Sequence, residues 1–146
     1  MIKSILISLG VGILSFLFTM SNMNIYGEIN TLIEPPKILF PIVWSILYIL
    51  MGISSYKIFK SNDYKKVDAL WLYGCQLIVN FFWSIIFFNF RNFLLSFIWI
   101  VALDILVIIM IVYFYKINKK AGLLQIPYIL WLAFATFLTY QIYVLN

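Results

Sequence analysis

The segment Trp71–Phe90, WLYGCQLIVNFFWSIIFFNF, decides the fold, because it is long and apolar and still carries uncharged polar groups through its centre. On a helix, five of its side chains fall along one side: Tyr73, Gln76, Asn80, Trp83 and Phe87. A buried amide without a hydrogen-bond partner costs roughly 2 to 7 kcal/mol. We therefore expect Gln76 and Asn80 to face other helices or a cavity, and not lipid.

The composition indicates a membrane protein. The chain has 146 residues, of which 65% are hydrophobic and 10% are charged, and this leaves too little polar surface for a water-soluble domain. Five segments are long enough to cross about 30 Å of hydrocarbon at about 1.5 Å per residue. They cover residues 4–21, 38–57, 68–88, 93–115 and 122–145. The sequence therefore predicts an all-α fold, a single five-helix transmembrane domain over residues 1–146.

The basic residues predict an orientation in the membrane. Lys37 and Arg91 fall on one side of the five-span topology, and all the other basic residues fall on the opposite side. By the positive-inside rule, the N-terminus is cytoplasmic and the C-terminus lies outside. Because the charges are scattered over loop ends and not gathered on one helix face, we expect no nucleic-acid partner. The Ile-, Asn- and Lys-rich composition favours a bacterial plasma membrane.

Several kinds of chemistry are excluded by residue type. The chain contains no histidine and a single cysteine, Cys75, so we predict no metal site, no intramolecular disulfide and no conventional catalytic residue.

Asp104 lies inside the fourth segment, where a carboxylate is either functional or hydrogen-bonded to a tyrosine or serine of a neighbouring helix. We favour the second interpretation. In the fifth segment, Pro127 removes a backbone hydrogen bond and can kink the helix.

Three further faces are expected to lie inside the bundle. In the second segment Trp44 shares a face with Tyr48, although an aromatic residue at this depth can also anchor the membrane surface. In the fifth segment Trp131 shares a face with Ala135. The first segment carries a stripe of small residues that lets another helix approach closely: Ser4, Ser8, Gly12, Ser15 and Thr19. The connection at residues 22–37 is long and rich in turn residues, which is typical of a lid or of a simple tether.

Four pieces of the sequence resemble a known family when they are taken together in this order. They are PPKILFPIVWSILYILMG at 35–52, LYGCQLIVNFFWSIIFF at 72–88, AGLLQIPYILWLAFATFLTY at 121–140 and LN at 145–146. The set resembles the tryptophan-rich sensory protein family, also called the translocator protein or peripheral benzodiazepine receptor family. The resemblance implies a five-helix bundle, often a homodimer, with a ligand pocket under the first long loop.

The resemblance also implies ligands and site residues. Members bind protoporphyrin-type tetrapyrroles and synthetic benzodiazepine-type compounds, and no obligatory cofactor is expected. Carried over by matching residues, the pocket would be formed by Tyr26, Trp44, Tyr48, Asn80, Trp83, Trp131 and Ala135. Two departures from the family pattern bear on the binding of cholesterol and on the pairing of subunits. Tyr140 is followed by QIYVLN without the basic residue of the animal cholesterol motif, and Trp71 and Cys75 stand where some members pair through small residues.

Four functions are compatible with this sequence. The first is sensory or regulatory binding of a porphyrin, in a slot walled by Trp44, Trp83 and Trp131. The second is light- and oxygen-dependent porphyrin breakdown, in which the tryptophans Trp44 and Trp131 would be reactants. The third is transport of a tetrapyrrole or lipid, for which we find no internal repeat and no paired broken helices. The fourth is a purely structural role, since polar and aromatic residues inside bundles often serve packing alone.

Overall fold

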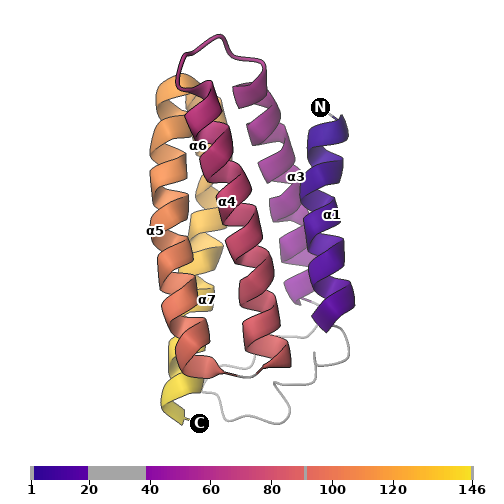
Figure 1. Cartoon of the computed structure of the whole chain (residues 1–146), viewed down its shortest axis with the longest axis vertical. Helices are drawn as coiled ribbons and strands as arrows, with labels where there is room; N and C mark the ends of the chain where they lie inside the picture. The colour runs from indigo at the N-terminus through magenta and orange to yellow at the C-terminus, as the bar shows by residue number, and fades with distance from the viewer. Residues whose placement is uncertain (1, 20–38, 91, 146) are drawn as a thin grey trace.

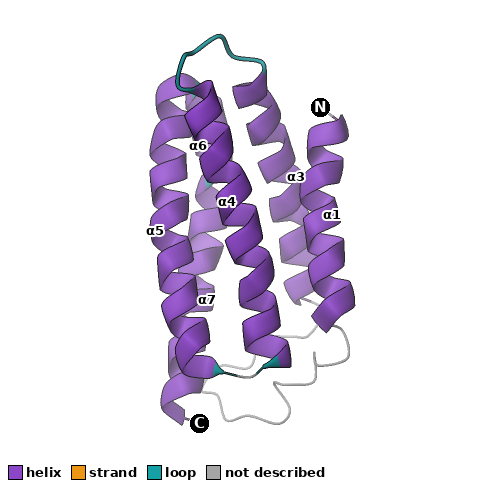
Figure 2. Cartoon of the chain, viewed as in Figure 1, coloured by secondary structure: helices purple, strands orange, loops and turns teal. Residues whose placement is uncertain are grey.

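The computed structural model describes residues 2–19, 39–90 and 92–145, and these residues are almost entirely helical (Figures 1 and 2). No strand occurs among them, so the predicted all-α fold is confirmed. In chain order the elements are α1 (Ile2–Thr19), α3 (Leu39–Phe59), α4 (Lys66–Ser84), the π-helical turn η2 (Ile85–Asn89), α5 (Phe93–Ile117), α6 (Lys119–Leu124) and α7 (Ile126–Leu145).

Four of the five predicted spans are long and apolar enough to cross a membrane. They are Ile42–Phe59, Lys66–Phe87, Phe93–Ile117 and Lys119–Leu145. The first predicted span, 4–21, coincides with α1, whose stretch Ile2–Ser15 is apolar but shorter than those four. The prediction of a helical membrane protein is therefore supported, and the ends of the predicted segments differ from the observed helices by only a few residues.

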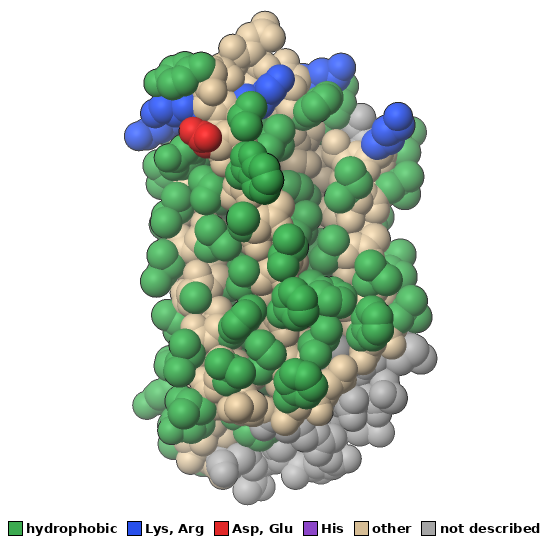
Figure 3. Space-filling view, in the orientation of Figure 1, with side chains coloured by type: hydrophobic (Ala, Val, Ile, Leu, Met, Phe, Trp, Pro, Cys, Tyr) green, Lys and Arg blue, Asp and Glu red, His purple; other side chains and the backbone are tan. Residues whose placement is uncertain are grey.

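The helices lie side by side along one long axis, with α1 against α3, α4 against α5 and α5 against α7 (Figure 1). α1 begins at one end of the bundle and α7 ends at the other. Eight lysines lie at the end where α1 and α4 begin and α3 and α5 finish, and Figure 3 shows blue side chains gathered there: Lys3, Lys57, Lys60, Lys65, Lys66, Lys116, Lys119 and Lys120. Lys37 and Arg91 lie outside the described residues.

Ser8 and Gly12 of the small-residue stripe on α1 pack against α3, as the sequence predicts. The Ser8 hydroxyl donates a hydrogen bond to the backbone carbonyl of Tyr48 at 2.6 Å. A Cβ atom added to Gly12 would lie 2.6 Å from Cε2 of Tyr48, and one added to Gly52 would lie 2.5 Å from the backbone Cα of Ile5. Because these distances are far below van der Waals contact, a larger residue at Gly52 would collide with the backbone of α1, and one at Gly12 would displace the Tyr48 ring.

The last predicted span is divided into two helices. Asn118 caps the start of α6, and its side chain accepts hydrogen bonds from the backbone N–H groups of Lys120 and Ala121. α6 ends at Leu124, with Gln125 as its C-cap, and α7 begins at Ile126. Pro127 explains the division, because it has no N–H to offer to the carbonyl four residues earlier and its ring crowds that carbonyl. The sequence predicted a kink at Pro127, and the structure shows an interruption of the helix at Gln125, two residues before the proline.

Candidate functional site

A buried hydrogen-bond network joins three helices at the middle of the bundle. The Tyr48 hydroxyl of α3 donates to Oδ1 of Asn80 on α4 at 3.0 Å. Nδ2 of Asn80 in turn donates to the hydroxyl of Tyr128 on α7 at 2.8 Å. These side chains are almost entirely inaccessible. One amide side chain therefore links α3 to α7, and the prediction that Asn80 faces other helices is confirmed.

Gln76, one turn earlier on α4, completes this network. The Tyr128 hydroxyl donates to Oε1 of Gln76 at 2.6 Å, and Nε2 of Gln76 lies 3.9 Å from the sulfur of Met51 on α3. The Gln76 side chain has 0% exposure. Every hydroxyl and amide in the set consequently has a partner on another helix, which is what an apolar surrounding requires. We call Tyr48, Gln76, Asn80 and Tyr128 the polar network.

Aromatic rings surround the polar network on the α3 and α7 side. The Trp44 ring stacks on Tyr48 with centroids 5.6 Å apart, and it meets Tyr128 edge to face at 6.2 Å. Trp44 also contacts Trp131 edge to face, at 6.4 Å and 90°. Both indoles are half-buried, whereas the two tyrosines are buried. We call Trp44, Tyr48, Tyr128 and Trp131 the aromatic cluster.

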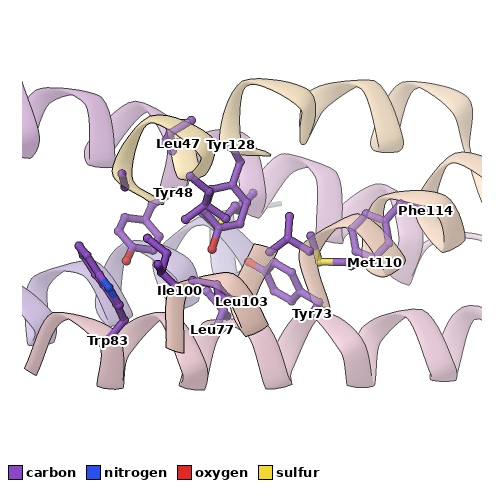
Figure 4. Close-up of a cluster of buried hydrophobic side chains, with 14 of the residues drawn as sticks. Leu47, Tyr48, Tyr73, Leu77, Trp83, Ile100, Leu103, Met110, Phe114 and Tyr128 are labelled. Atoms are coloured by element: carbon purple, nitrogen blue, oxygen red, sulfur yellow. The ribbon is translucent and has the colours of Figure 1, made fainter. Parts of the chain in front are cut away.

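The structure brings four of the sequence-predicted site residues together: Trp44, Tyr48, Asn80 and Trp131. Trp83 is buried on α4 one turn beyond Asn80, where its ring stacks on Phe87 at 5.2 Å. Figure 4 shows Trp83 toward the same end of the buried side chains as Tyr48. Ala135 is buried on α7 one turn beyond Trp131, and its carbonyl accepts a hydrogen bond from Thr139. Tyr26 lies outside the described residues.

Tyr128 and Gln76 were not among the site residues predicted from the sequence. Tyr128 precedes Trp131 by three positions and Gln76 precedes Asn80 by four, so helical spacing already placed each beside a predicted site residue. What the sequence did not contain is the pairing, because Tyr128 and Gln76 are 52 positions apart. In three dimensions they are bonded, and Tyr128 belongs to both the network and the cluster.

The described residues contain no group of histidine, cysteine, aspartate or glutamate side chains that could hold a metal ion. Cys75, the single cysteine, is exposed on α4. The arrangement offers half-buried aromatic surface beside buried neutral polar groups.

Comparisons with known proteins agree with this architecture. The profile of the TspO/MBR family matches residues 4–145. The chain belongs to the TspO/MBR family. It is similar to the tryptophan-rich protein TspO of Archaeoglobus fulgidus, at 37% identity over all of this chain and 96% of that protein. It is also 28% identical to the tryptophan-rich sensory protein of Cereibacter sphaeroides, over 77% of this chain and 70% of that protein. The human translocator protein is 33% identical over 75% of this chain and 67% of that protein.

Membership of the TspO/MBR family confirms the resemblance drawn from the four sequence pieces. Together with the four apolar spans, it identifies the chain as an integral membrane protein. The match begins at residue 4, so it includes α1 as well as the longer spans.

In this TspO/MBR protein, Asp104 is hydrogen-bonded to a neighbouring helix, as the favoured interpretation held. The Thr136 hydroxyl of α7 lies 2.6 Å from Oδ2 of Asp104 on α5, and it also lies 2.7 Å from the backbone carbonyl of Leu132. The partner is a threonine, whereas the sequence pointed to tyrosine or serine. This pair joins α5 to α7.

We expect Asp104→Asn to leave the stability of the protein nearly unchanged, because an amide can donate to the Thr136 hydroxyl while that hydroxyl donates to Leu132. Thr136→Val should lower the free energy of unfolding by about 1 kcal/mol through loss of the interhelical bond. Thermal unfolding of both variants in the same detergent measures the difference. A loss for Asp104→Asn as large as that for Asp104→Leu would contradict this account and would point to a need for the charge.

Proposed function

We propose that this protein is a five-span sensory or regulatory membrane protein that binds a flat tetrapyrrole, such as protoporphyrin, at the aromatic cluster. Benzodiazepine-type hydrophobic compounds would occupy the same place. The observation that carries the proposal is the contact among four aromatic rings, those of Trp44, Tyr48, Tyr128 and Trp131. Two of these rings, Tyr48 and Tyr128, are fixed by the hydrogen bonds of the polar network. The names of the relatives, a sensory protein and a translocator protein, support this class of function.

The chemistry of the cluster suits such a ligand. A planar macrocycle gains most from aromatic faces and edges, each worth roughly 0.5 to 1.5 kcal/mol beyond the area that it buries. Neutral polar groups beside those rings fix the orientation of the ligand without the cost of burying a charge. Asn80 acts behind the rings: it is buried, and its two hydrogen bonds hold the Tyr48 and Tyr128 side chains in place.

The packing of the two indoles decides how the ligand would lie. Trp44 and Trp131 contact each other, so a macrocycle does not fit between them as they stand. Both rings are half-buried, and part of each is therefore left uncovered by the protein. We propose that the two indoles act as one wall against which the macrocycle lies, with Trp83 and Ala135 supporting the helices behind it.

The proposal includes an orientation and an assembly. The lysine-rich end would be cytoplasmic by the positive-inside rule, in a bacterial plasma membrane, with α1 as the fifth span. A homodimer would use the outer face of α4, where apolar side chains are exposed: Trp71, Ile78 and Phe82. Cross-linking in native membranes tests the assembly, and labelling of single cysteines placed near either terminus tests the orientation.

Replacing both indoles should weaken porphyrin binding. We expect the double variant Trp44→Phe with Trp131→Phe to bind protoporphyrin about tenfold more weakly, because two aromatic contacts at roughly 0.5 to 1.5 kcal/mol each are reduced. Titration of protoporphyrin into the purified protein, followed by absorbance of the bound porphyrin, gives the affinity independently of the number of tryptophans.

Trp71→Phe is the matched control, because Trp71 is 71% exposed on α4 and lies outside the aromatic cluster. This variant should bind porphyrin as the unchanged protein does. Equal affinities for the double variant and the unchanged protein would remove the aromatic cluster as the binding site. Equal losses in the double variant and in Trp71→Phe would indicate a general effect of tryptophan loss.

A further inference from the structure

A concave site lies at the lysine-rich end, between the start of α1 and the end of α3. It is a cavity of about 510 Å³. Its walls combine apolar and cationic side chains, and its six lining residues are Ile2, Lys3, Ser4, Tyr56, Phe59 and Lys60. None of these residues belongs to the polar network or the aromatic cluster, so the cavity is a separate feature of the molecule.

The two lysines of the cavity are available to a ligand. Among the described residues neither Lys3 nor Lys60 forms an ion pair, and Lys60 Nζ lies 5.7 Å from the centre of the Tyr56 ring. Lys66, by contrast, donates from Nζ to the carbonyl of Phe59 at the end of α3. On the face that Figure 3 shows, the acidic surface lies near the start of α4 and not beside the start of α1. The cavity is thus a local concentration of unpaired positive charge.

The apolar walls place a second requirement on the ligand, which has to cover apolar side chains as well as neutralise the lysines. Ile2 is 74% exposed and Phe59 is 57% exposed, and both lie at the lysine-rich end of the bundle, where the positive-inside rule places lipid headgroups. A free anion would satisfy the lysines and leave these two side chains uncovered. An amphiphile with an anionic head and an acyl chain satisfies both, and basic pockets at the ends of transmembrane helices bind such headgroups.

We propose that this cavity binds one acidic glycerophospholipid of the surrounding leaflet, with its phosphate between Lys3 and Lys60 and an acyl chain along Ile2 and Phe59. The hydroxyl groups of Ser4 and Tyr56 are the remaining donors that line the site. The bound lipid joins the beginning of α1 to the end of α3, at the opposite end of these helices from the connection over residues 20–38. This site is independent of the porphyrin proposal.

Native mass spectrometry of the full chain in detergent tests the proposal, with phosphatidylglycerol and phosphatidylcholine of identical acyl chains as probes. We expect one phosphatidylglycerol to be retained under conditions that remove phosphatidylcholine. The variant Lys3→Gln with Lys60→Gln should bind phosphatidylglycerol about thirtyfold more weakly, which is roughly fivefold for each lysine near an anionic lipid. Lys3→Arg with Lys60→Arg should restore most of the binding.

Lys119→Gln with Lys120→Gln is the matched control, because it removes the same charge from the same end of the bundle at the start of α6. An equal loss of lipid in this control would overturn the proposal in favour of diffuse attraction. Equal retention of phosphatidylcholine would overturn it as well. Glycerol phosphate competing as strongly as the whole lipid would overturn it in favour of a site for a free anion. Circular dichroism of each variant verifies that the helices are intact.

Discussion

Gly52→Leu should destabilise this protein strongly, because the backbones of α1 and α3 are in close contact at this position. The new side chain would start 2.5 Å from the Cα and 2.8 Å from the backbone nitrogen of Ile5, and backbone atoms cannot rotate away as a flexible side chain can. α1 would have to move off α3, which would also stretch the bond from Ser8 to the Tyr48 carbonyl. We expect a loss of about 3 kcal/mol or more, at the upper end of overpacking effects. Thermal unfolding in detergent measures it.

Gly74→Ala is the matched control for this prediction. A Cβ atom added to Gly74, which lies in α4, meets no heavy atom within 4 Å. Replacing a helical glycine by alanine with no steric conflict should stabilise the protein by roughly 0.5 to 1 kcal/mol. Gly52→Ala should fall between the two variants. If Gly52→Leu unfolds at the same temperature as the unchanged protein, then α1 does not pack on α3 as described.

Asn80→Leu should affect both stability and ligand binding. The substitution removes the acceptor of the Tyr48 hydroxyl and the donor to Tyr128, and leucine offers neither. At roughly 1 to 2 kcal/mol for each interhelical side-chain hydrogen bond, we expect a loss of about 2 to 3 kcal/mol. Porphyrin affinity should fall as well, because Tyr48 and Tyr128 carry two of the rings in the aromatic cluster. Thermal unfolding and porphyrin titration on the same preparation measure the two effects.

A double-mutant cycle with Tyr48→Phe separates the hydrogen bond from the change of shape. If Asn80 and Tyr48 act through their bond, the double variant should lose less stability than the sum of the two single variants. Additive losses would show that the bond contributes nothing and that leucine merely fits poorly. Tyr128→Phe gives the second arm of the cycle, since its hydroxyl lies between Asn80 and Gln76.

The helices could be predicted from the sequence because hydropathy and length are local properties. The inward face of α4 was also predictable, since an amide inside a membrane has to find a partner and Gln76 and Asn80 are four positions apart. For the division at Gln125, the disturbance of the helix could be predicted, but its position could not. Proline indicates a local disturbance, but the residue where the helix ends depends on how the surrounding helices hold its two parts.

The partners of the polar groups could not be predicted. Asn80 could have bonded to any hydroxyl on the facing helices, and the choice of Tyr48 and Tyr128 depends on how far each helix is rotated and shifted along its axis. The contact between Trp44 and Trp131 depends on the same rotations, whereas a slot for a ligand between these rings was expected from the sequence. Spacing along one helix gives the face of a residue, while the distance across the bundle requires the packed structure.

The break at Gln125 divides the last span into two parts that are held by different contacts. α6 is clamped, because Ser54 donates to the Ala121 carbonyl at 2.7 Å and Gly122 fits directly against the backbone of Tyr115. At the break itself, the Gln125 side-chain amide is buried and has no hydrogen-bond partner among the described residues, so its side chain adds no hydrogen bond between α6 and α7. Beyond it, α7 carries both Tyr128 and Trp131. The two rings that the last span gives to the aromatic cluster therefore both lie on α7, whereas α6, at the lysine-rich end, is held separately by α3 and α5.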